Sequence, residues 1–447
     1  MPEAVYRMLT VLCRLVVLLP VGTNLGLLHL LWMLVSGRLL ATRGAVIPGL
    51  SECGLSARAV RRAWAALGQG DWTSEELLAQ WWALVATEGC WQPHCHGGYH
   101  PLAVDVTGFW RPRLRDCPTR HVQAEAGKAL PAILVGLIGR VGSVGGQRLA
   151  LPLAFVRADR ADPRSSTHDR LLVRAAVAQC ADDDALVLDA GFSLALLRDE
   201  GATRYVVRCA KNSAFRRARP PAYRGRGRIP TRGVLVRPLA RTFKGRTLPA
   251  TPADRAETWL DEGVELRAAI WEDLVRSDAP PDSPPFTVVA VHDPRYREPL
   301  LLASSLAVTA HTLHALYHDR WPVEQLPLAA KQMLGAARAF VHAPETCQRL
   351  PALALLAGAI LSYAAASSPP IPTGFWDRCP QPTPGRLRRV LAHTPFPQDV
   401  PLPARMRVKA APTAHLPTGF WGQRRRSAPL PTVTAPHPPP SPFREAA

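Results

Sequence analysis

Four side chains in the last third of the chain have the types and spacing needed to handle a phosphate group and a metal ion. They are Tyr317, Arg320, Glu324 and Lys331, and the last three follow the tyrosine by three, seven and fourteen residues. At about 100° per residue these positions fall within about 60° of one another around a helix. A carboxylate can hold a divalent metal, whereas Arg and Lys hold phosphate oxygens. The spacing suits cleavage or joining of a phosphodiester, although a solvated helix face with one acid among bases has the same pattern.

Two prolines interrupt this helical segment. An interior proline costs about 3 kcal/mol because it clashes with the preceding turn and lacks an amide donor. Pro322 is compatible with a helix that starts there, since the first turn needs no amide donor. Pro327 lies in or just after that turn. A kink at Pro327 is expected to disturb the register between Glu324 and Lys331.

The order of these residues resembles a motif of a known family. Tyr-His-Asp-Arg-Trp-Pro-Val-Glu at 317–324, followed by Lys-Gln-Met-Leu-Gly at 331–335, is similar to the Tyr-x2-Arg-x3-Glu-x6-Lys motif of DDE transposases from bacterial insertion sequences. The spacings match, and the strand-like stretch at 300–306 is also similar to the family. Pro327 is a departure, since the family usually has a non-proline residue near this position. The resemblance covers roughly residues 100–365.

The resemblance implies two further aspartates, each at the end of a buried strand. Asp105 follows Pro-Leu-Ala-Val at 101–104, and Asp189 follows Ala-Leu-Val-Leu at 185–188. Each comes after a short apolar run and before a glycine, the pattern of a strand that runs into a turn. Taken alone, an aspartate in such a place is most often a turn former or a helix cap. Their flanking sequences and their order, however, resemble the two Asp motifs of the family.

Three carboxylates suit this chemistry because cleavage of a phosphodiester by water needs an activated nucleophile and a stabilised leaving oxygen. Two Mg²⁺ ions about 3.5–4 Å apart provide both, and Mg²⁺ takes oxygen ligands while keeping several waters. The resemblance therefore implies Asp105, Asp189 and Glu324 as catalytic metal ligands, with Mn²⁺ as an alternative ion. It also implies that DNA phosphates and bases are positioned by Tyr317, Arg320 and Lys331.

The charge of the chain agrees with a polyanionic partner. Lys and Arg number 54 against 35 Asp and Glu, which gives a net charge of +19. The stretch 201–253 holds 14 basic residues and no acidic one, so it is expected to include a loop that follows a phosphate backbone; a basic linker or a general arginine bias is the alternative. Arg208, on a strand pattern just after the Asp189 segment, is expected to reach the site and bind DNA.

Alternating strand and helix patterns predict an α/β fold, and the resemblance implies a ribonuclease H-like mixed sheet with flanking helices. Strand patterns cover 99–110, 149–157, 185–189, 203–209, 264–270 and 286–291. The long gap between Asp189 and Glu324 resembles family members that carry an inserted domain. The expected domains are an N-terminal helical, DNA-end-binding domain at 1–95, the first part of the catalytic core at 96–210, a basic, mostly β insertion at 211–285, the second part of the core at 286–365, and a Pro-rich, disordered tail at 366–447 with 19 of the 45 prolines.

These features predict a DDE transposase that cuts the DNA ends of its own element and joins them to target DNA. Its expected partners are double-stranded DNA and a second copy of the chain in the DNA complex, with no small-molecule substrate, at the nucleoid in the bacterial cytoplasm. One alternative is an inactive, DNA-binding remnant of a transposase. Another is a membrane-anchored basic protein that uses the uncharged stretch 17–37, for which a buried helical hairpin is the favoured interpretation.

A second group of residues has the types that bind zinc. Cys90, His94, Cys95, His96 and His100 lie close together in the sequence, but their spacing fits no familiar zinc motif and no second ligand pair is apparent. The nine cysteines are scattered and odd in number. This pattern favours reduced thiols in a cytosolic protein.

Overall fold

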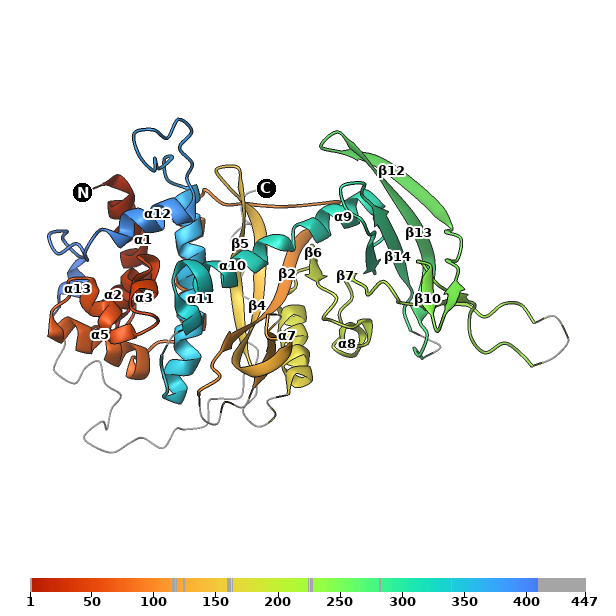
Figure 1. The fold of residues 1–447 in the computed structure, drawn as a ribbon, viewed down its shortest axis with the longest axis horizontal. Helices are drawn as coiled ribbons and strands as arrows, with labels where there is room; N and C mark the ends of the chain where they lie inside the picture. Colours follow the sequence, from red (N-terminus) through yellow and green to blue (C-terminus); the bar gives the residue numbers. More distant parts are fainter. Residues whose placement is uncertain are drawn as a thin grey trace. The chain divides into compact units, whose positions relative to one another are not determined.

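The protein is an α/β protein with a large mixed sheet of 13 strands, which confirms the fold class expected from the sequence (Figure 1). The computed structural model describes residues 2–408 except 115, 116, 118, 124, 159–161, 163, 224, 226, 227, 281, 282 and 339. The chain forms two compact units. Unit 1 comprises Met1–Pro93, Val106–His168 and Pro322–Ala447, and unit 2 comprises His94–Asp105 and Asp169–Trp321. Each unit therefore combines stretches that are distant in sequence.

The N-terminal part of unit 1 is helical. Its helices are α1 (Glu3–Val16), α2 (Thr23–Val35), α3 (Arg38–Ala41), α4 (Val46–Glu52), α5 (Ala57–Gln69) and α6 (Ser74–Glu88). The chain turns between α1 and α2, so the uncharged stretch 17–37 is not one continuous helix, and α2 is buried almost throughout. Ser56 caps α5 by accepting a hydrogen bond from the amide of Ala59, as its position before a basic helix predicts.

Helix α6 begins with a capping box. The Thr73 hydroxyl accepts from the amide of Glu76, and the Glu76 carboxylate accepts from the amide of Thr73. Two amides that have no partner within the helix are thereby satisfied. We expect Thr73→Ala to lower the free energy of unfolding by about 1 kcal/mol, measured by urea denaturation.

Thr87→Ala is a matched control for this change, because Thr87 is exposed near the other end of α6 and bonds only a carbonyl of its own helix. Its expected effect is within about 0.5 kcal/mol. Equal effects of the two replacements would show that the capping box does not stabilise α6.

A long apolar helix, α11 (Pro344–Ala366), lies among the N-terminal helices of unit 1 (Figure 1). It ends at Ala366, as the Ala/Leu-rich pattern predicts. By length and composition it could cross a membrane, but 89% of its most apolar window is buried inside the protein. One side contacts α2 and α5, and it also contacts two strands of the sheet. The helix is thus an element of the core of unit 1.

The strands of unit 1 are β1 (Gln92–Pro93), β3 (Arg120–Gln123), β4 (Lys128–Val144) and β5 (Gln147–Arg157), together with the second half of β2 (His100–Trp110). The antiparallel pair β4–β5 is joined by Gly145 and Gly146. Both glycines have positive φ, 54° and 76°, which a two-residue hairpin turn of this type requires. The long, apolar β4 is a strand that the sequence patterns did not identify.

Unit 2 contains the first half of β2 and a series of strands that continue the sheet. They are β6 (Asp184–Leu188), β7 (Tyr205–Arg208), β8 (Phe215–Arg217), β9 (Leu235–Val236), β12 (Arg255–Asp261), β13 (Val264–Arg276), β14 (Phe286–His292) and β15 (Leu300–Ser304). A separate hairpin is formed by β10 (Arg241–Phe243) and β11 (Arg246–Leu248). β2, β6 and β7 are parallel neighbours, whereas β15 and β14 continue antiparallel. The predicted strands that correspond to β2, β5, β6, β7, β13 and β14 are confirmed.

The helices of the remaining chain are α7 (Ser165–Gln179), α8 (Leu194–Asp199), α9 (Ala310–His318), α10 (Trp321–Leu328), the π-helical turn η1 (Ala329–Met333) and the 3-10 turn η2 (Ala336–Arg338). They are followed by α12 (Pro384–Ala392) and α13 (Ala404–Arg407). The proline content predicts disorder from 366 onward, yet α12 buries Leu387 and Leu391 completely. The tail is therefore ordered up to Val408, because enough apolar side chains lie between its prolines, and 409–447 lie outside the described residues.

Candidate functional site

The two predicted aspartates occupy equivalent positions on neighbouring strands of unit 2. β2 and β6 run parallel, and their last aligned pair is Val104 with Leu188. The next residue along each strand is Asp105 on one side and Asp189 on the other. Neighbouring strands lie about 4.8 Å apart, and in-register residues of parallel strands point to the same face. The register therefore brings the backbone of Asp105, inside β2, next to that of Asp189, the first residue after β6.

A third strand, β7, places a cation next to the two aspartates, and we call Asp105, Asp189 and Arg208 the row. Val207 of β7 is aligned with Leu188, so Arg208 comes next to Asp189. Its guanidinium lies 3.8 Å from the Asp189 carboxylate, and both side chains are about half exposed. An ion pair with this exposure contributes at most about 1 kcal/mol to stability. Its effect is to hold a positive charge beside one of the two carboxylates.

Helix α9 brings the tyrosine of the motif to the same carboxylate. Leu313 and Leu316 are buried in the hydrophobic core of unit 2, which fixes the helix on the sheet. The Tyr317 hydroxyl then donates to an Asp189 oxygen over 3.4 Å. Burial raises the pKa of Tyr317, while the nearby Arg320 opposes the shift. The phenol therefore stays protonated and available as a donor at neutral pH.

Arg320 lies directly after the end of α9. Its guanidinium is 5.6 Å from the centre of the Tyr317 ring, a distance typical of a cation–π contact. The residue is only 5% exposed. In this conformation Arg320 places its positive charge next to Tyr317, and its side chain is too buried for DNA to contact it directly.

The four motif residues do not share one regular helix. Tyr317 lies in the last turn of α9, Glu324 lies in the first turn of α10, and Lys331 lies in η1. The chain starts a new helix at Trp321, so Pro322 is in the first turn, where it needs no donor. Pro327 lies inside α10 and lacks the amide that would continue the hydrogen-bond ladder, and the wider π-turn follows two residues later, closed by the Leu334 amide and the Ala329 carbonyl. The expected single helix face is thus wrong, for the reason that the two prolines indicate.

Lys331 is anchored to the second half of β2 within unit 1. Its ammonium donates to the Thr107 hydroxyl over 2.6 Å, and lies 4.7 Å from the Trp110 ring and 5.2 Å from the Phe109 ring. Burial, and then the charge of Lys331, lowers the pKa of His121. Thr107 is two residues after Asp105 along β2, so the lysine is tied to the strand that carries this aspartate.

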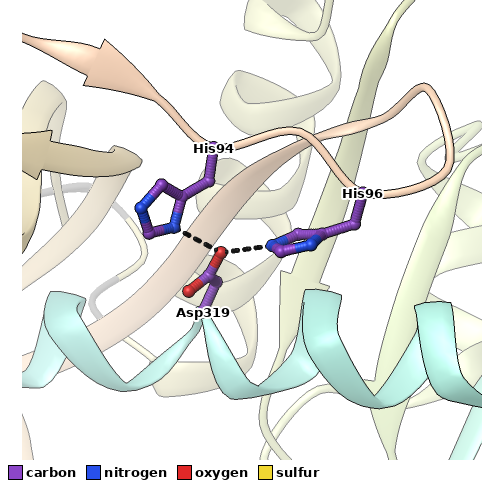
Figure 2. Close-up of side chains that lie close together, drawn as sticks. All are labelled: His94, His96 and Asp319. Atoms are coloured by element: carbon purple, nitrogen blue, oxygen red, sulfur yellow. Dashed lines mark hydrogen bonds and ion pairs between the residues drawn. The ribbon is translucent and has the colours of Figure 1, made fainter.

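A group of three side chains that the motif analysis did not connect lies at the end of α9 (Figure 2). One oxygen of Asp319 is 2.8 Å from His94 Nδ1 and 2.7 Å from His96 Nε2. Burial raises the pKa of Asp319, but the hydrogen bonds and charges of the two histidines outweigh it and hold the pKa below its usual range. Among the residues that the structure describes, this is the one set of three His, Cys, Asp or Glu side chains with ligand atoms within 4.8 Å of one another.

The sequence pattern includes two of these three residues. His94 and His96 belong to the region with zinc-binding residue types, whereas Asp319 lies inside the motif and is separated from them by more than two hundred residues. Cys90 and Cys95, considered in the same context, are exposed, free thiols and lie outside the group. All nine cysteines lie in the described part of the chain and none forms a disulfide; Cys379 is the third exposed one. Only the folded chain shows that the missing ligand is the aspartate before Arg320.

Several cations of the basic stretch are already paired. Arg217 binds both oxygens of Asp254 over 2.5–2.6 Å, and Lys211 forms an ion pair with Glu298. Arg241 and Lys244 lie beside the exposed Phe243 ring on the β10–β11 hairpin. Arg224 and Arg226 lie outside the described residues. The described part of this stretch therefore presents fewer unpaired charges than its composition suggests.

The adjacent aspartates have the ligand type that Mg²⁺ prefers. Carboxylate oxygens suit this ion, and a few of them suffice because it keeps several waters. Arg208 and Tyr317, both next to Asp189, add a cation and a hydrogen-bond donor of the kinds that contact phosphate oxygens. No protein-family model matches the chain, and a comparison with curated proteins found no match.

Proposed function

We propose that the protein is a DDE transposase that cuts the ends of its element with Mg²⁺ and joins them to target DNA. The observation that carries this proposal is the row formed by Asp105, Asp189 and Arg208 on β2, β6 and β7. The two aspartates predicted from separate parts of the sequence each follow a member of the aligned pair Val104 and Leu188. If the two aspartates only formed turns, nothing would require them to lie at matching positions of adjacent strands.

In this proposal Asp105, Asp189 and Glu324 hold Mg²⁺, which when bound activates water and stabilises the leaving oxygen. Arg208 draws the phosphate toward Asp189 by its charge. Tyr317 donates its hydroxyl proton in a hydrogen bond at the same place, and Lys331, held by Thr107, provides a second cation for the DNA backbone.

The strand order supports a ribonuclease H-like core. β5 pairs with β4, β4 neighbours β2, and β2 is followed by the parallel strands β6 and β7. An antiparallel pair, β4 and β5, next to the parallel strands β2, β6 and β7 supports such a core. The described strands between β7 and β14 support a mostly β insertion at this point of the chain.

The charge supports DNA as the partner. A net charge of +19 favours a polyanion, and binding through phosphates releases counterions, so the affinity should fall steeply with salt. The proposed substrate is double-stranded DNA that carries the ends of the element, with a second copy of the chain in the complex.

The proposal is tested with a duplex that contains the inverted repeat flanking the coding region. The wild-type chain should nick this duplex at the repeat in Mg²⁺ but not in EDTA. Glu324→Gln should abolish nicking, because an amide lacks the negative charge with which a carboxylate holds a divalent metal ion. Glu345→Gln, which changes an exposed glutamate in the first turn of α11, is the matched control and should cut normally.

One observation favours a second candidate, an inactive remnant that still binds DNA. Lys331 lies in a π-turn that begins two residues after Pro327. Pro327 is the position at which this chain departs from the family motif. A remnant would bind the duplex but would not cut it, whichever divalent metal ion is added. Nicking that depends on both Mg²⁺ and Glu324 would rule this candidate out.

A further inference from the structure

We propose that His94, His96 and Asp319 form a zinc site, separate from the proposed Mg²⁺ ligands. The three ligand atoms, two imidazole nitrogens and one carboxylate oxygen, converge from two distant segments of unit 2 (Figure 2). Imidazole nitrogen suits Zn²⁺, whereas Mg²⁺ prefers oxygen. Three protein ligands with water as the fourth form a tetrahedral zinc site.

The distances are close to those that zinc needs. Ligand bonds of about 2.0–2.1 Å in a tetrahedron place neighbouring ligand atoms about 3.3 Å apart. The two oxygen–nitrogen distances are 2.8 and 2.7 Å. The ion would therefore fit if each oxygen–nitrogen distance increased by about half an ångström. Rotation of the side chains can provide this change without movement of the backbone.

The hairpin that presents His96 is rigid. His96 and Tyr99 exchange two backbone hydrogen bonds across Gly97 and Gly98, whose φ angles are 58° and 86°. Both angles favour glycine. A Cβ on Gly97 would also lie 2.8 Å from the Thr312 side chain of α9. The hairpin thus packs against the helix that ends at Asp319, which places His96 next to the carboxylate.

The backbone at His94 is held by His100. The Nδ1 atom of His100 lies 2.6 Å from the His94 carbonyl oxygen, and since a carbonyl only accepts, Nδ1 carries the proton. Such contacts around the ligands fix their orientation in metal sites. The site is also accessible to an ion, because the His94 and His96 side chains are 24% and 28% exposed while Asp319 is 4% exposed.

A metal at this place would join two parts of the proposed active site. His94 and His96 lie just before the strand that carries Asp105, and Asp319 lies between Tyr317 and Arg320. Zinc would therefore connect the start of β2 with the end of α9. This structural role rests on the proposed function, but the binding of the ion does not.

The test is a zinc titration of the untagged, metal-stripped chain without DNA and without Mg²⁺, in competition with a chromophoric chelator. We expect one Zn²⁺ per chain. His94→Gln and His96→Gln should each weaken binding by at least about 100-fold, and His100→Gln by about 10- to 100-fold, the effect typical of a residue that orients a ligand. Cys95→Ser, between the two histidines, is the matched control and should bind as the wild type does.

Cobalt substitution gives a second measurement that does not depend on the stability of the variants. Co²⁺ bound by these ligands should show the intense visible bands of a tetrahedral ion, and Zn²⁺ should remove them. Circular dichroism verifies that the variants are folded. Absence of stoichiometric zinc in the wild type, or unchanged affinity in both His variants, would mean that the group is only a hydrogen-bonded cluster. Neither result would affect the Mg²⁺-dependent nicking test.

Discussion

Replacing Asp189 with asparagine should reduce Mg²⁺-dependent nicking by at least about 10²–10³-fold, the loss typical when a group that stabilises developing charge is removed. Asp189 lies at the centre of the row, next to Asp105, Arg208 and the Tyr317 hydroxyl. Asparagine keeps the size and a carbonyl oxygen but removes the negative charge. The rate of nicking under single-turnover conditions measures the effect, and gel-shift titration measures DNA binding, which should not weaken.

Asp182→Asn is the control for this prediction. Asp182 is exposed in the turn that precedes β6, whereas Asp189 follows this strand. Replacement of such a surface residue usually has little effect on the folded protein, so the nicking rate should stay within a factor of about two. If Asp189→Asn nicks DNA as fast as the wild type, Asp189 is a turn residue and the metal site is elsewhere.

The largest expected effect on stability comes from Trp81→Ala, which should lower the free energy of unfolding by about 3–5 kcal/mol. Trp81 is fully buried in unit 1. Its ring contacts Tyr363 of α11 edge to face, with centroids 5.1 Å apart. The replacement removes this contact and leaves a cavity between α6 and α11. Urea denaturation followed by circular dichroism measures the loss.

Trp376→Ala tests whether loss of any tryptophan has this effect. Trp376 is 66% exposed, and its replacement should change the free energy of unfolding by no more than about 0.5 kcal/mol. A loss below about 1 kcal/mol in Trp81→Ala would contradict the proposed packing of α6 on α11, since a well-packed core does not close around such a cavity.

The local patterns that identify strands were sufficient for much of the sheet. Short apolar runs bounded by turn residues predicted β2, β6 and β7, with Asp189 directly after β6. Asp105 was expected at the end of a strand, but it lies inside β2, which continues to Trp110. The alignment of the two aspartates could not be read from the sequence, because register between strands depends on packing across 84 residues of intervening chain. The resemblance to the transposase motif suggested the pairing, and the register of β2 with β6 supports it.

Other elements were missed for physical reasons. The 17 residues of β4 are almost continuously apolar and include Pro131, and such a run cannot be assigned to strand or helix by periodicity. The segment after Ala366 was expected to be disordered because of its prolines, although Leu387 and Leu391 give α12 a buried face. The partner of His94 and His96 was not apparent, since a ligand so distant in sequence leaves no spacing signal.

The distribution of the thiols offers a practical way to observe this region. Cys95, which lies between His94 and His96 in the sequence, is exposed, whereas Cys13, Cys53 and Cys347 are buried and burial raises the pKa of each thiol. Maleimide dyes should therefore modify Cys95 with Cys90 and Cys379, and Cys90→Ser combined with Cys379→Ser would leave it as the main site of labelling. Fluorescence from that position would report on the surroundings of Asp319 when zinc or DNA is added.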